Sequence, residues 1–366
     1  MVVGVPKEVK EQENRVALLP SAAYQLVKHG HTVVVEECAG AGSGYPDKDY
    51  TDAGAELTAD HAEIFGRADL IVKVKEPQPE EYGLLRGNQI LFTYLHLAAN
   101  RALTDALLAS GITAIAYETV EVHRRLPLLE PMSEIAGRMS IIVGGYFLAK
   151  HCGGTGVLLG GVAGVLPGRV VVLGGGTAGV NAARMANGLG ADVTILEVDI
   201  ERMRFLDITM HTAHTLYSSE AHLFELMPNV DLLIGAVLVP GARAPKLIRR
   251  DMLRLMKPGS VFVDIAIDQG GCAETSRPTT HEEPVFVEEN ITHYCVANMP
   301  AAYARTATQA LTNATFRYIE ALADGGLKGA CAREPALGSG INVMNGKVTN
   351  QAVAEAHKLP FEAPEV

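Results

Sequence analysis

Short apolar runs rich in Val and Ile alternate along the first third of the chain with segments that have helical spacing. Strands are predicted at Val2–Val5, Thr32–Glu36, Leu70–Val74, Ile90–Leu95 and Thr113–Tyr117. Helices are predicted at Ser21–His29 and Arg101–Leu108. Ser21 is the expected N-cap of the first helix, and Gly30 and Gly111 are the expected stops. This alternation favours a mostly parallel sheet covered by helices.

The pattern continues after a helical stretch that runs from Met132 to about Lys150. Further strands are predicted at Arg169–Leu173, Asp192–Leu196, Asp231–Ala236, Ser260–Ile267 and His293–Asn298, with a helix at Val180–Leu189. Apolar residues then recur with helical spacing over Thr306–Ala323, which predicts a long helix after Pro300. We expect this helix to return the chain to the first domain and to leave Gly325–Val366 there as a C-terminal appendage.

The segment from Arg169 to Glu197 carries a dinucleotide-binding fingerprint. Gly174, Gly176 and Gly179 form G-x-G-x-x-G directly between a β-branched strand and a helix. The first glycine allows a tight turn, the second lets the main chain approach a pyrophosphate, and the third allows close packing of helix and strand. Glu197 ends the next strand, where a carboxylate accepts hydrogen bonds from ribose hydroxyls and repels a 2′-phosphate. The predicted cofactor is therefore NAD, although Arg202 nearby leaves NADP open.

These elements predict an α/β protein with two Rossmann-like, doubly wound domains and a cleft between them. The cofactor domain is inserted into the substrate domain. Residues 1–130 and 304–366 are expected to form the substrate domain, and residues 131–303 the NAD-binding domain.

Composition narrows the class of partner. The net charge of −11 argues against a nucleic-acid partner, because no basic surplus exists to neutralise phosphates. The least charged stretch, Cys152–Gly168, is too short and too rich in glycine for a membrane span, and the N-terminus is a first strand rather than a signal peptide. Five dispersed cysteines without C-x-x-C spacing indicate reduced thiols in a cytoplasmic protein. A metal site is not expected; a set made of Cys272, His281, His293 and Cys295 matches no tight ligand spacing.

Four ionisable residues lie at or just beyond predicted strand ends, where ligands bind in open α/β sheets. They are Arg15, Lys75, His96 and Asp268. Each has a simpler interpretation: a surface cation, a loop lysine, a core histidine or a turn cap. Together, beside a dinucleotide site, they favour catalysis.

The whole chain resembles the alanine dehydrogenase family. The matching motifs are GVPKE, Asn14–Arg15–Val16, VKVKEP, LFTYLHLAA, IAYET, PMSEIAGRMS, LLIGAVLVPGARAPKL, VDIAIDQGG and VANMPAA, in that order. The resemblance implies reversible, NAD-linked conversion of L-alanine to pyruvate and ammonium, with glyoxylate as a possible second substrate. It also implies a homo-oligomer, commonly a hexamer.

The resemblance further implies roles for individual residues. Arg15 would bind the substrate carboxylate, and Lys75 would bind that carboxylate or polarise the carbonyl oxygen. His96 would act as acid and base, and Asp268 would hold the water or the amine. The cofactor positions implied by the family, together with the fingerprint, are Ser133, Gly174, Gly176, Thr177, Ala178, Gly179, Glu197, Arg202, Ser218, Val237, Leu238, Ile265, Ala266, Ile267, Asp268, Arg277, Val296, Ala297, Asn298 and Met299.

Two other functions remain open at this point. One is a saccharopine dehydrogenase, which would need room for a long dicarboxylic substrate. The other is a non-catalytic NAD(H)-binding subunit of the transhydrogenase type. Such a subunit would keep Gly174–Glu197 but would have no need for Lys75 and His96 together.

Overall fold

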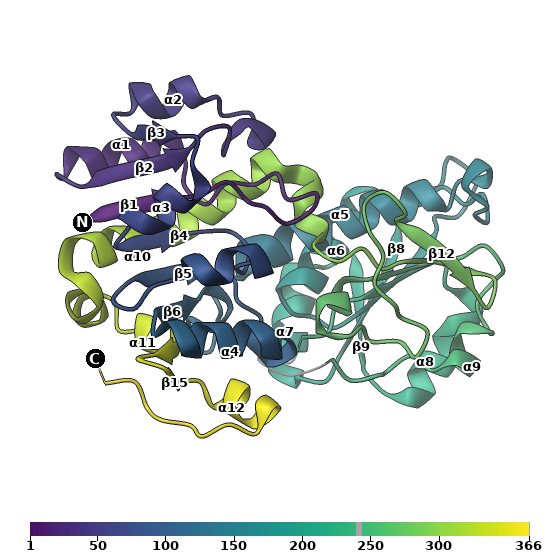
Figure 1. The fold of residues 1–366 in the computed structure, drawn as a ribbon. Coiled ribbons are helices and arrows are strands. Elements are labelled where there is room, and N and C mark those ends of the chain that lie inside the picture. The colour runs from purple at the N-terminus through teal and green to yellow at the C-terminus, as the bar shows by residue number, and fades with distance from the viewer. Residues whose placement is uncertain (239–243, 366) are drawn as a thin grey trace. The chain divides into compact units, whose positions relative to one another are not determined.

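The computed structural model describes residues 1–238 and 244–365. The chain divides into two compact units, one made of Met1–Pro131 with Tyr303–Val366 and the other of Met132–Ala302. The second unit is therefore an insertion in the sequence of the first (Figure 1). Within the described ranges, every helix is too short or too polar to span a membrane.

The first unit contains an eight-stranded sheet in the order β15-β14-β6-β5-β4-β1-β2-β3 (Figure 1). Its strands are β1 (Val2–Val5), β2 (Thr32–Glu36), β3 (Glu56–Thr58), β4 (Leu70–Val72), β5 (Ile90–Thr93), β6 (Thr113–Ala116), β14 (Ile341–Met344) and β15 (Lys347–Val348). Strands β1 to β6 are parallel, and the chain winds outward from β1 in both directions, as in a doubly wound fold. The predicted fold class is confirmed.

The C-terminal segment is more than an appendage, which corrects the expectation for Gly325–Val366. Strand β14 pairs antiparallel with β6, and β15 pairs antiparallel with β14. Strand β14 is completely buried, so the segment supplies core as well as sheet edge.

The helices of the first unit are α1 (Pro20–Lys28), α2 (Asp47–Asp52), α3 (His61–Arg67), α4 (Arg101–Ser110), α10 (Ala304–Arg333), α11 (Leu337–Gly340) and α12 (Gln351–His357). Short 3-10 helices are η1 (Ala41–Ser43), η2 (Pro79–Leu84), η3 (Leu97–Ala99) and η4 (Tyr117–Thr119). Ser21 is not the N-cap of α1, because Pro20 already occupies the first helical turn and Leu19 is the N-cap. Helix α10 runs past the predicted end at Ala323 and has one non-helical residue, Gly326, at φ 60°.

The second unit contains a seven-stranded sheet in the order β12-β13-β11-β10-β7-β8-β9. Its strands are β7 (Arg169–Leu173), β8 (Asp192–Glu197), β9 (Ala213–Tyr217), β10 (Leu232–Gly235), β11 (Val261–Asp264), β12 (Val285–Glu288) and β13 (Ile291–Tyr294). All except β12 are parallel, and the winding direction changes between β7 and β10. Ligands of doubly wound sheets bind at this point of reversal.

The helices of this unit are α5 (Glu130–Phe147), α6 (Thr177–Gly188), α7 (Ile200–Thr209), α8 (Glu220–Leu226) and α9 (Arg250–Leu253). The 3-10 helices are η5 (Lys150–Cys152), η6 (Met227–Asn229), η7 (Ile265–Gln269) and η8 (Met299–Tyr303). Two predicted strands are too long: β11 stops at Asp264, where η7 begins, and β13 stops at Tyr294.

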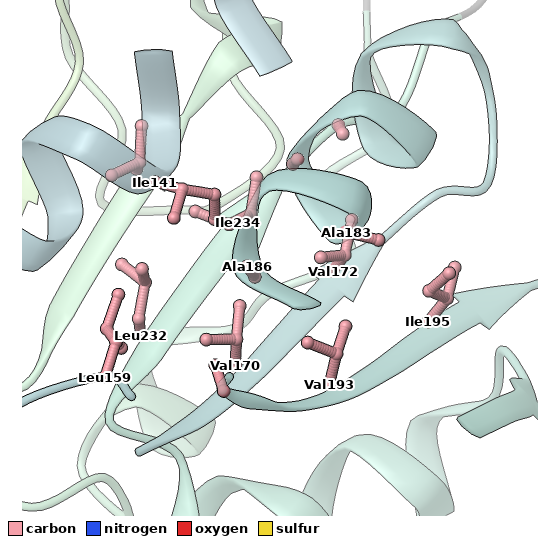
Figure 2. Packing of buried hydrophobic residues seen from close by; sticks show 14 of the residues in the cluster. Ile141, Leu159, Val170, Val172, Ala183, Ala186, Val193, Ile195, Leu232 and Ile234 are labelled. Carbon is pink, nitrogen blue, oxygen red and sulfur yellow. The ribbon is translucent and has the colours of Figure 1, made fainter. Parts of the chain in front are cut away.

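Alternate residues of the central strands face opposite sides, as the pleat requires. Figure 2 shows the face covered by α6, where side chains from three strands meet Ala183 and Ala186. These strand residues are Val170, Val172, Val193, Ile195, Leu232 and Ile234. The intervening residues Val171, Leu173 and Leu233 belong to the cluster on the other face. The small alanines let α6 lie close to the sheet, which places its N-terminus at the ends of β7 and β10.

Candidate functional site

The glycine loop between β7 and α6 is shaped by backbone contacts that no larger residue could make. Gly174 has φ +103°, and a Cβ there would lie 2.6 Å from the carbonyl oxygen of Ala236, which follows β10. A Cβ on Gly179 would lie 1.8 Å from the carbonyl oxygen of Gly174. The loop is thus packed against the end of β10, at the reversal of the sheet.

Gly176 is different, because a Cβ there would meet nothing within 4 Å. It is the N-cap of α6, and a glycine there has no side chain to cap the first turn. The main-chain N–H groups at the start of α6, around Thr177 and Ala178, form the positive end of the helix dipole, and the N-cap residue offers them no side-chain acceptor. Open space in front of an uncapped helix N-terminus fits a pyrophosphate group.

Glu197 and Arg202 both hold the middle of this loop. Glu197 Oε2 accepts a hydrogen bond from Gly175 N–H at 2.7 Å, and Arg202 Nε donates to the Gly175 carbonyl oxygen at 2.6 Å. Glu197 Oε1 also accepts from Val198 N–H at 2.7 Å and Asp199 N–H at 3.0 Å. Since an ionised carboxylate has about four acceptor positions, capacity remains for a ribose hydroxyl. The loop, the helix and this acid together fit a dinucleotide.

The other predicted cofactor residues mostly follow strands of this same sheet. Ser218 follows β9, and its N–H donates to the Glu197 carbonyl oxygen at 2.8 Å. Val237 and Leu238 follow β10; residues 239–243 of the motif that contains them lie outside the described residues. Ile265–Asp268 forms most of η7, and Val296–Met299 follows β13. Ser133 lies near the start of α5, and Arg277 stacks on the Phe286 ring at 3.9 Å from the centroid.

Asp268 is an exposed residue of η7 rather than the end of a strand. Its carboxylate has no hydrogen bond or ion pair with the described residues, so it can receive a ligand. Sequence reasoning missed Asp264, which ends β11 and is the N-cap of η7. The buried Asp264 carboxylate accepts hydrogen bonds from Ala266 N–H at 3.0 Å, Cys272 N–H at 2.9 Å and Ser276 Oγ at 2.5 Å. Burial raises the pKa of Asp264.

Lys75 and His96 lie in the first unit, just beyond the ends of the adjacent strands β4 and β5. Strands β4 and β5 both end earlier than predicted, but Lys75 and His96 still lie at the same edge of the sheet. Lys75 is buried, and its ammonium has no hydrogen bond or ion pair with any residue in 1–238 or 244–365. His96 is half-buried, its ring lies parallel to that of Tyr94 with centroids 6.0 Å apart, and its nitrogens lack a hydrogen bond to the described part of the chain.

Arg15 is a buried residue, not a surface cation. Its guanidinium pairs with Glu13 through Nε at 2.7 Å and a terminal nitrogen at 2.5 Å. Burial opposes the charge, but Glu13 outweighs it, so the pKa of Arg15 is raised. The structure places Arg15, Lys75 and His96 in one unit and Asp268 in the other.

A buried ion cluster beside Lys75 was not predicted. Lys73 is completely buried, with Nζ 3.2 Å from Glu8 and 2.8 Å from Glu81. Burial lowers the pKa of Lys73, but the two acids outweigh it and the net shift is upward. In the sequence, the only indication of this ion cluster is that Glu8 and Lys73 lie within the motifs GVPKE and VKVKEP. A single lysine in a strand otherwise made of Val and Ile does not reveal its partners.

The residues weighed for a metal site have other partners. His293 shares a hydrogen bond with Thr275 Oγ1 at 2.8 Å and another with the Ile291 carbonyl oxygen at 2.9 Å. Cys272 lies against Asp264. Among the described residues, no group of three His, Cys, Asp or Glu is arranged to hold a metal ion.

Comparison with known proteins agrees with this geometry. The family model described as "Alanine dehydrogenase/PNT, N-terminal domain" matches residues 4–136, and "Alanine dehydrogenase/PNT, C-terminal domain" matches residues 140–351. The alanine dehydrogenase of Halomonas elongata is 56% identical over 363 residues, which cover 99% of this chain and 98% of that protein. The alanine dehydrogenase of Mycobacterium tuberculosis is 52% identical and covers 100% of this chain, with 99% of its own length matched.

Solved structures agree as well. An L-alanine dehydrogenase structure has a TM-score of 0.93 at 50% identity, covering 98% of this chain and 99% of that one. A transhydrogenase from Sinorhizobium meliloti has a TM-score of 0.82 at 26% identity, covering 95% of this chain and 100% of that one. The two family models and the full-length relatives establish that this chain belongs to the alanine dehydrogenase/PNT family.

Proposed function

We propose that this chain is an NAD-dependent L-alanine dehydrogenase. It converts L-alanine, water and NAD⁺ to pyruvate, ammonium, NADH and a proton, and it also runs in reverse. The observation that carries the proposal is the pair Lys75 and His96. Their side-chain nitrogens lie at neighbouring strand ends without hydrogen-bond partners among the described residues, in a chain whose second unit has a dinucleotide loop.

The second unit holds the cofactor, which supplies hydride acceptance and donation. The start of α6 binds the pyrophosphate through main-chain N–H groups, and Gly176 leaves room for its approach. Glu197 binds the ribose hydroxyls next to the loop that it anchors. The segments after β10, β11 and β13 bind the nicotinamide half.

Arg15 and Lys75 bind the substrate carboxylate in the first unit. Glu13 holds the Arg15 guanidinium in one orientation, and a planar guanidinium suits a planar carboxylate. The Lys75 ammonium has no hydrogen bond to the described chain, although its charge interacts with Glu76, and it binds the carboxylate or polarises the carbonyl oxygen of pyruvate. Two fixed cations select a small 2-oxo acid over a neutral molecule.

His96 moves the protons. During deamination, loss of hydride from the α-carbon and of a proton from the amine gives an imine, which water attacks. His96 accepts a proton from that water and returns it to the amine of the resulting carbinolamine. Ammonia then leaves as the remaining hydroxyl gives its proton to His96 and becomes the carbonyl group of pyruvate, and this proton converts ammonia to ammonium. By family resemblance, Asp268 holds the water or the amine.

The transhydrogenase-type alternative is weaker. The similarity to the Sinorhizobium meliloti transhydrogenase extends over the whole fold, but at 26% identity it falls well below the 50–56% of the alanine dehydrogenases. A subunit that only binds NAD(H) has no chemical need for Lys75 and His96 together. Glyoxylate, which also has a carboxylate beside a carbonyl, fits the same two cations.

We propose that the protein works as a homo-oligomer, a hexamer by family resemblance, in the cytoplasm. Its second unit exposes large apolar side chains that a partner subunit would cover: Ile142, Tyr146, Leu158, Val162, Val165 and Leu166. All five cysteines are free thiols, which suits a reducing compartment. Light scattering on the purified protein tests the oligomeric state.

The experiment for the activity follows NADH absorbance with ammonium plus pyruvate, glyoxylate, or 2-oxoglutarate with lysine, and repeats each with NADPH. Turnover with pyruvate that requires both ammonium and NADH supports the proposal. Turnover only with 2-oxoglutarate and lysine would assign a saccharopine dehydrogenase. Tight NADH binding without turnover on any substrate would favour a non-catalytic subunit.

A further inference from the structure

The main chain leaves the ladder of the first sheet just before Lys75 and His96. The last ladder-like bonds run from Lys73 N–H to the Phe92 carbonyl oxygen at 3.2 Å and from Tyr94 N–H to the Val74 carbonyl oxygen at 3.3 Å. Beyond these bonds, the main-chain N–H groups of Lys75 and His96 have no neighbouring strand to which they can donate a hydrogen bond. Side-chain carboxyl groups take over this role.

Glu118 binds the main chain at His96. Its Oε1 accepts from His96 N–H at 2.6 Å, and both its oxygens accept from Leu95 N–H, at 3.1 and 3.2 Å. His96 has φ 49° and ψ 38°, the left-handed region that a residue with a Cβ rarely adopts. The carboxyl group therefore stabilises a strained turn at the residue proposed to move protons.

Glu8 does the same at Lys75. Its Oε1 accepts from Val74 N–H at 2.6 Å and from Lys75 N–H at 3.4 Å, while its other oxygen faces Lys73. On the opposite side, Thr93 Oγ1 donates to the Lys75 carbonyl oxygen at 2.9 Å. The Lys75 peptide is thus held at both its N–H and its carbonyl group.

The sheet order explains why there are two such carboxyl groups. Strands β6, β5, β4 and β1 are consecutive neighbours. Glu118 follows β6 and reaches the end of β5; Glu8 follows β1 and reaches the end of β4. The ends of β5 and β4, which lead to His96 and Lys75, are therefore each held by a carboxyl group that follows the neighbouring strand.

We infer that Glu118 and Glu8 are positioning residues, and that Glu118 fixes His96 for proton transfer while Glu8 fixes Lys75 for substrate binding. The inference rests on the proposed function. The Lys75 and His96 side chains have no hydrogen-bond partner of their own in the described ranges, although both interact electrostatically with Glu76. Their orientation therefore depends strongly on the position of their main chain. A small displacement of a reacting group is enough to slow an enzyme strongly.

The first test compares Glu118→Ala, Glu118→Gln, His96→Ala and the double variant Glu118→Ala/His96→Ala. Glu118→Ala is expected to lower kcat by roughly 100-fold, with the KM for NADH and the NADH Kd unchanged. Glu118→Gln keeps an oxygen acceptor and should restore much of the loss. In the His96→Ala background, Glu118→Ala should change kcat by less than about twofold, since both changes remove one function.

The second test uses Glu8→Ala and Glu8→Gln. Glu8→Ala is expected to raise the KM for pyruvate by about tenfold or more, with a smaller effect on kcat and none on the KM for NADH. Glu8→Gln should recover most of the wild-type KM. If Glu8→Ala does not fold, Glu8→Ala/Lys73→Met, which removes the buried Glu8–Lys73 pair and leaves Glu81 with His61, is measured instead.

Asp60→Ala is the matched control. Asp60 also accepts main-chain hydrogen bonds, from Ala62 N–H at 2.9 Å and Glu63 N–H at 3.4 Å, at the start of α3. Asp60→Ala should lower the melting temperature but should leave kcat and the KM for pyruvate unchanged. Wild-type turnover is measured first: an inactive wild type contradicts the proposed function.

An active wild type combined with unchanged kinetics in Glu118→Ala and Glu8→Ala would overturn the inference. The inference would also be overturned if kcat of Glu118→Ala/His96→Ala fell by the product of the losses in the two single variants. So would an equal change of kcat and of every KM in both variants, because that pattern indicates only a general loss of structure.

Discussion

Gly175 N–H donates a hydrogen bond of 2.7 Å to Glu197 Oε2, so the acid proposed to bind the cofactor ribose also holds the phosphate-binding loop. Arg202 completes this arrangement by donating to the carbonyl oxygen of the same glycine. Cofactor selection and loop geometry therefore depend on one carboxylate. A substitution there affects both, and the experiment has to separate them.

Glu197→Ala is expected to weaken NADH binding by roughly 10- to 100-fold, because it removes a ribose acceptor and releases the loop. NADPH should lose less, since the repulsion of its 2′-phosphate disappears, so the ratio of NADPH to NADH affinity rises. Fluorescence titration with both nucleotides measures this. Glu201→Ala, which removes an exposed carboxylate of the next helix, is the control. An unchanged ratio would mean that Glu197 does not contact the ribose.

Gly176→Ala and Gly179→Ala should separate binding from folding. A Cβ on Gly176 meets open space at φ −69°, so the variant should keep its melting temperature and lose NADH affinity. A Cβ on Gly179 would collide with the Gly174 carbonyl oxygen, so that variant should be destabilised by about 2 kcal/mol or more. Thermal unfolding with and without NADH distinguishes the two. Full NADH affinity in Gly176→Ala would place the pyrophosphate elsewhere.

His96→Ala should lower kcat by about 100- to 10,000-fold, the range expected for a lost acid–base group. NADH binding should persist, because the glycine loop belongs to the other unit. Stopped-flow turnover and equilibrium NADH titration measure the two effects. His29→Ala, at an exposed histidine paired with Glu320, should leave both unchanged. Near-normal turnover in His96→Ala would remove this residue from the mechanism.

Arg15→Lys is a better test of carboxylate binding than Arg15→Ala. Truncation to alanine would leave Glu13 buried without its partner, a loss of about 3–5 kcal/mol in stability. Lysine keeps the charge but cannot form the planar, two-pronged contact, so the KM for pyruvate should rise about tenfold or more. Steady-state kinetics test this, with Arg67→Lys at an exposed ion pair as the control. An unchanged KM would assign the carboxylate to another cation.

The folded protein should become less stable at alkaline pH because His61 loses its proton. Hydrogen bonds to Glu36 and Glu81 raise the pKa of His61 from 6.5 to about 9. Protonation of His61 therefore stabilises the folded state. This contribution to the free energy of unfolding is complete below about pH 6.5 and is lost as the pH rises through about 9. Screening limits the gain to about 1–2 kcal/mol.

Urea unfolding at several pH values, compared with His61→Gln, measures this difference. The advantage of the wild type over the variant should shrink as the pH rises across that window. A difference in unfolding free energy that is the same at acidic and alkaline pH would show that the His61 charge does not contribute.

Some features of the chain depend on local chemistry, and the sequence alone determined them. The Val- and Ile-rich runs predicted most strands, and the bounds of β1, β2 and β7 are confirmed. The glycine loop could be located because its glycine spacing, Gly174 to Gly179, is local, although the close contact of Gly174 with Ala236 is not. The doubly wound fold also followed, because strand–helix alternation restricts the topology.

Other features were decided only by the tertiary structure, because they depend on residues far apart in the chain. The predicted ends of β4 and β5 were too long, since carboxyl groups from Glu8 and Glu118 replace the ladder there. No local pattern shows that Lys73 is paired inside the core with Glu8, which lies 65 residues earlier in the chain. The strands β14 and β15 were missed because β14 is placed by pairing with β6, more than two hundred residues earlier, and β15 in turn pairs with β14. Periodicity reports which residues are buried, whereas the partners of buried charges are chosen by contacts that form only when the sheet is assembled.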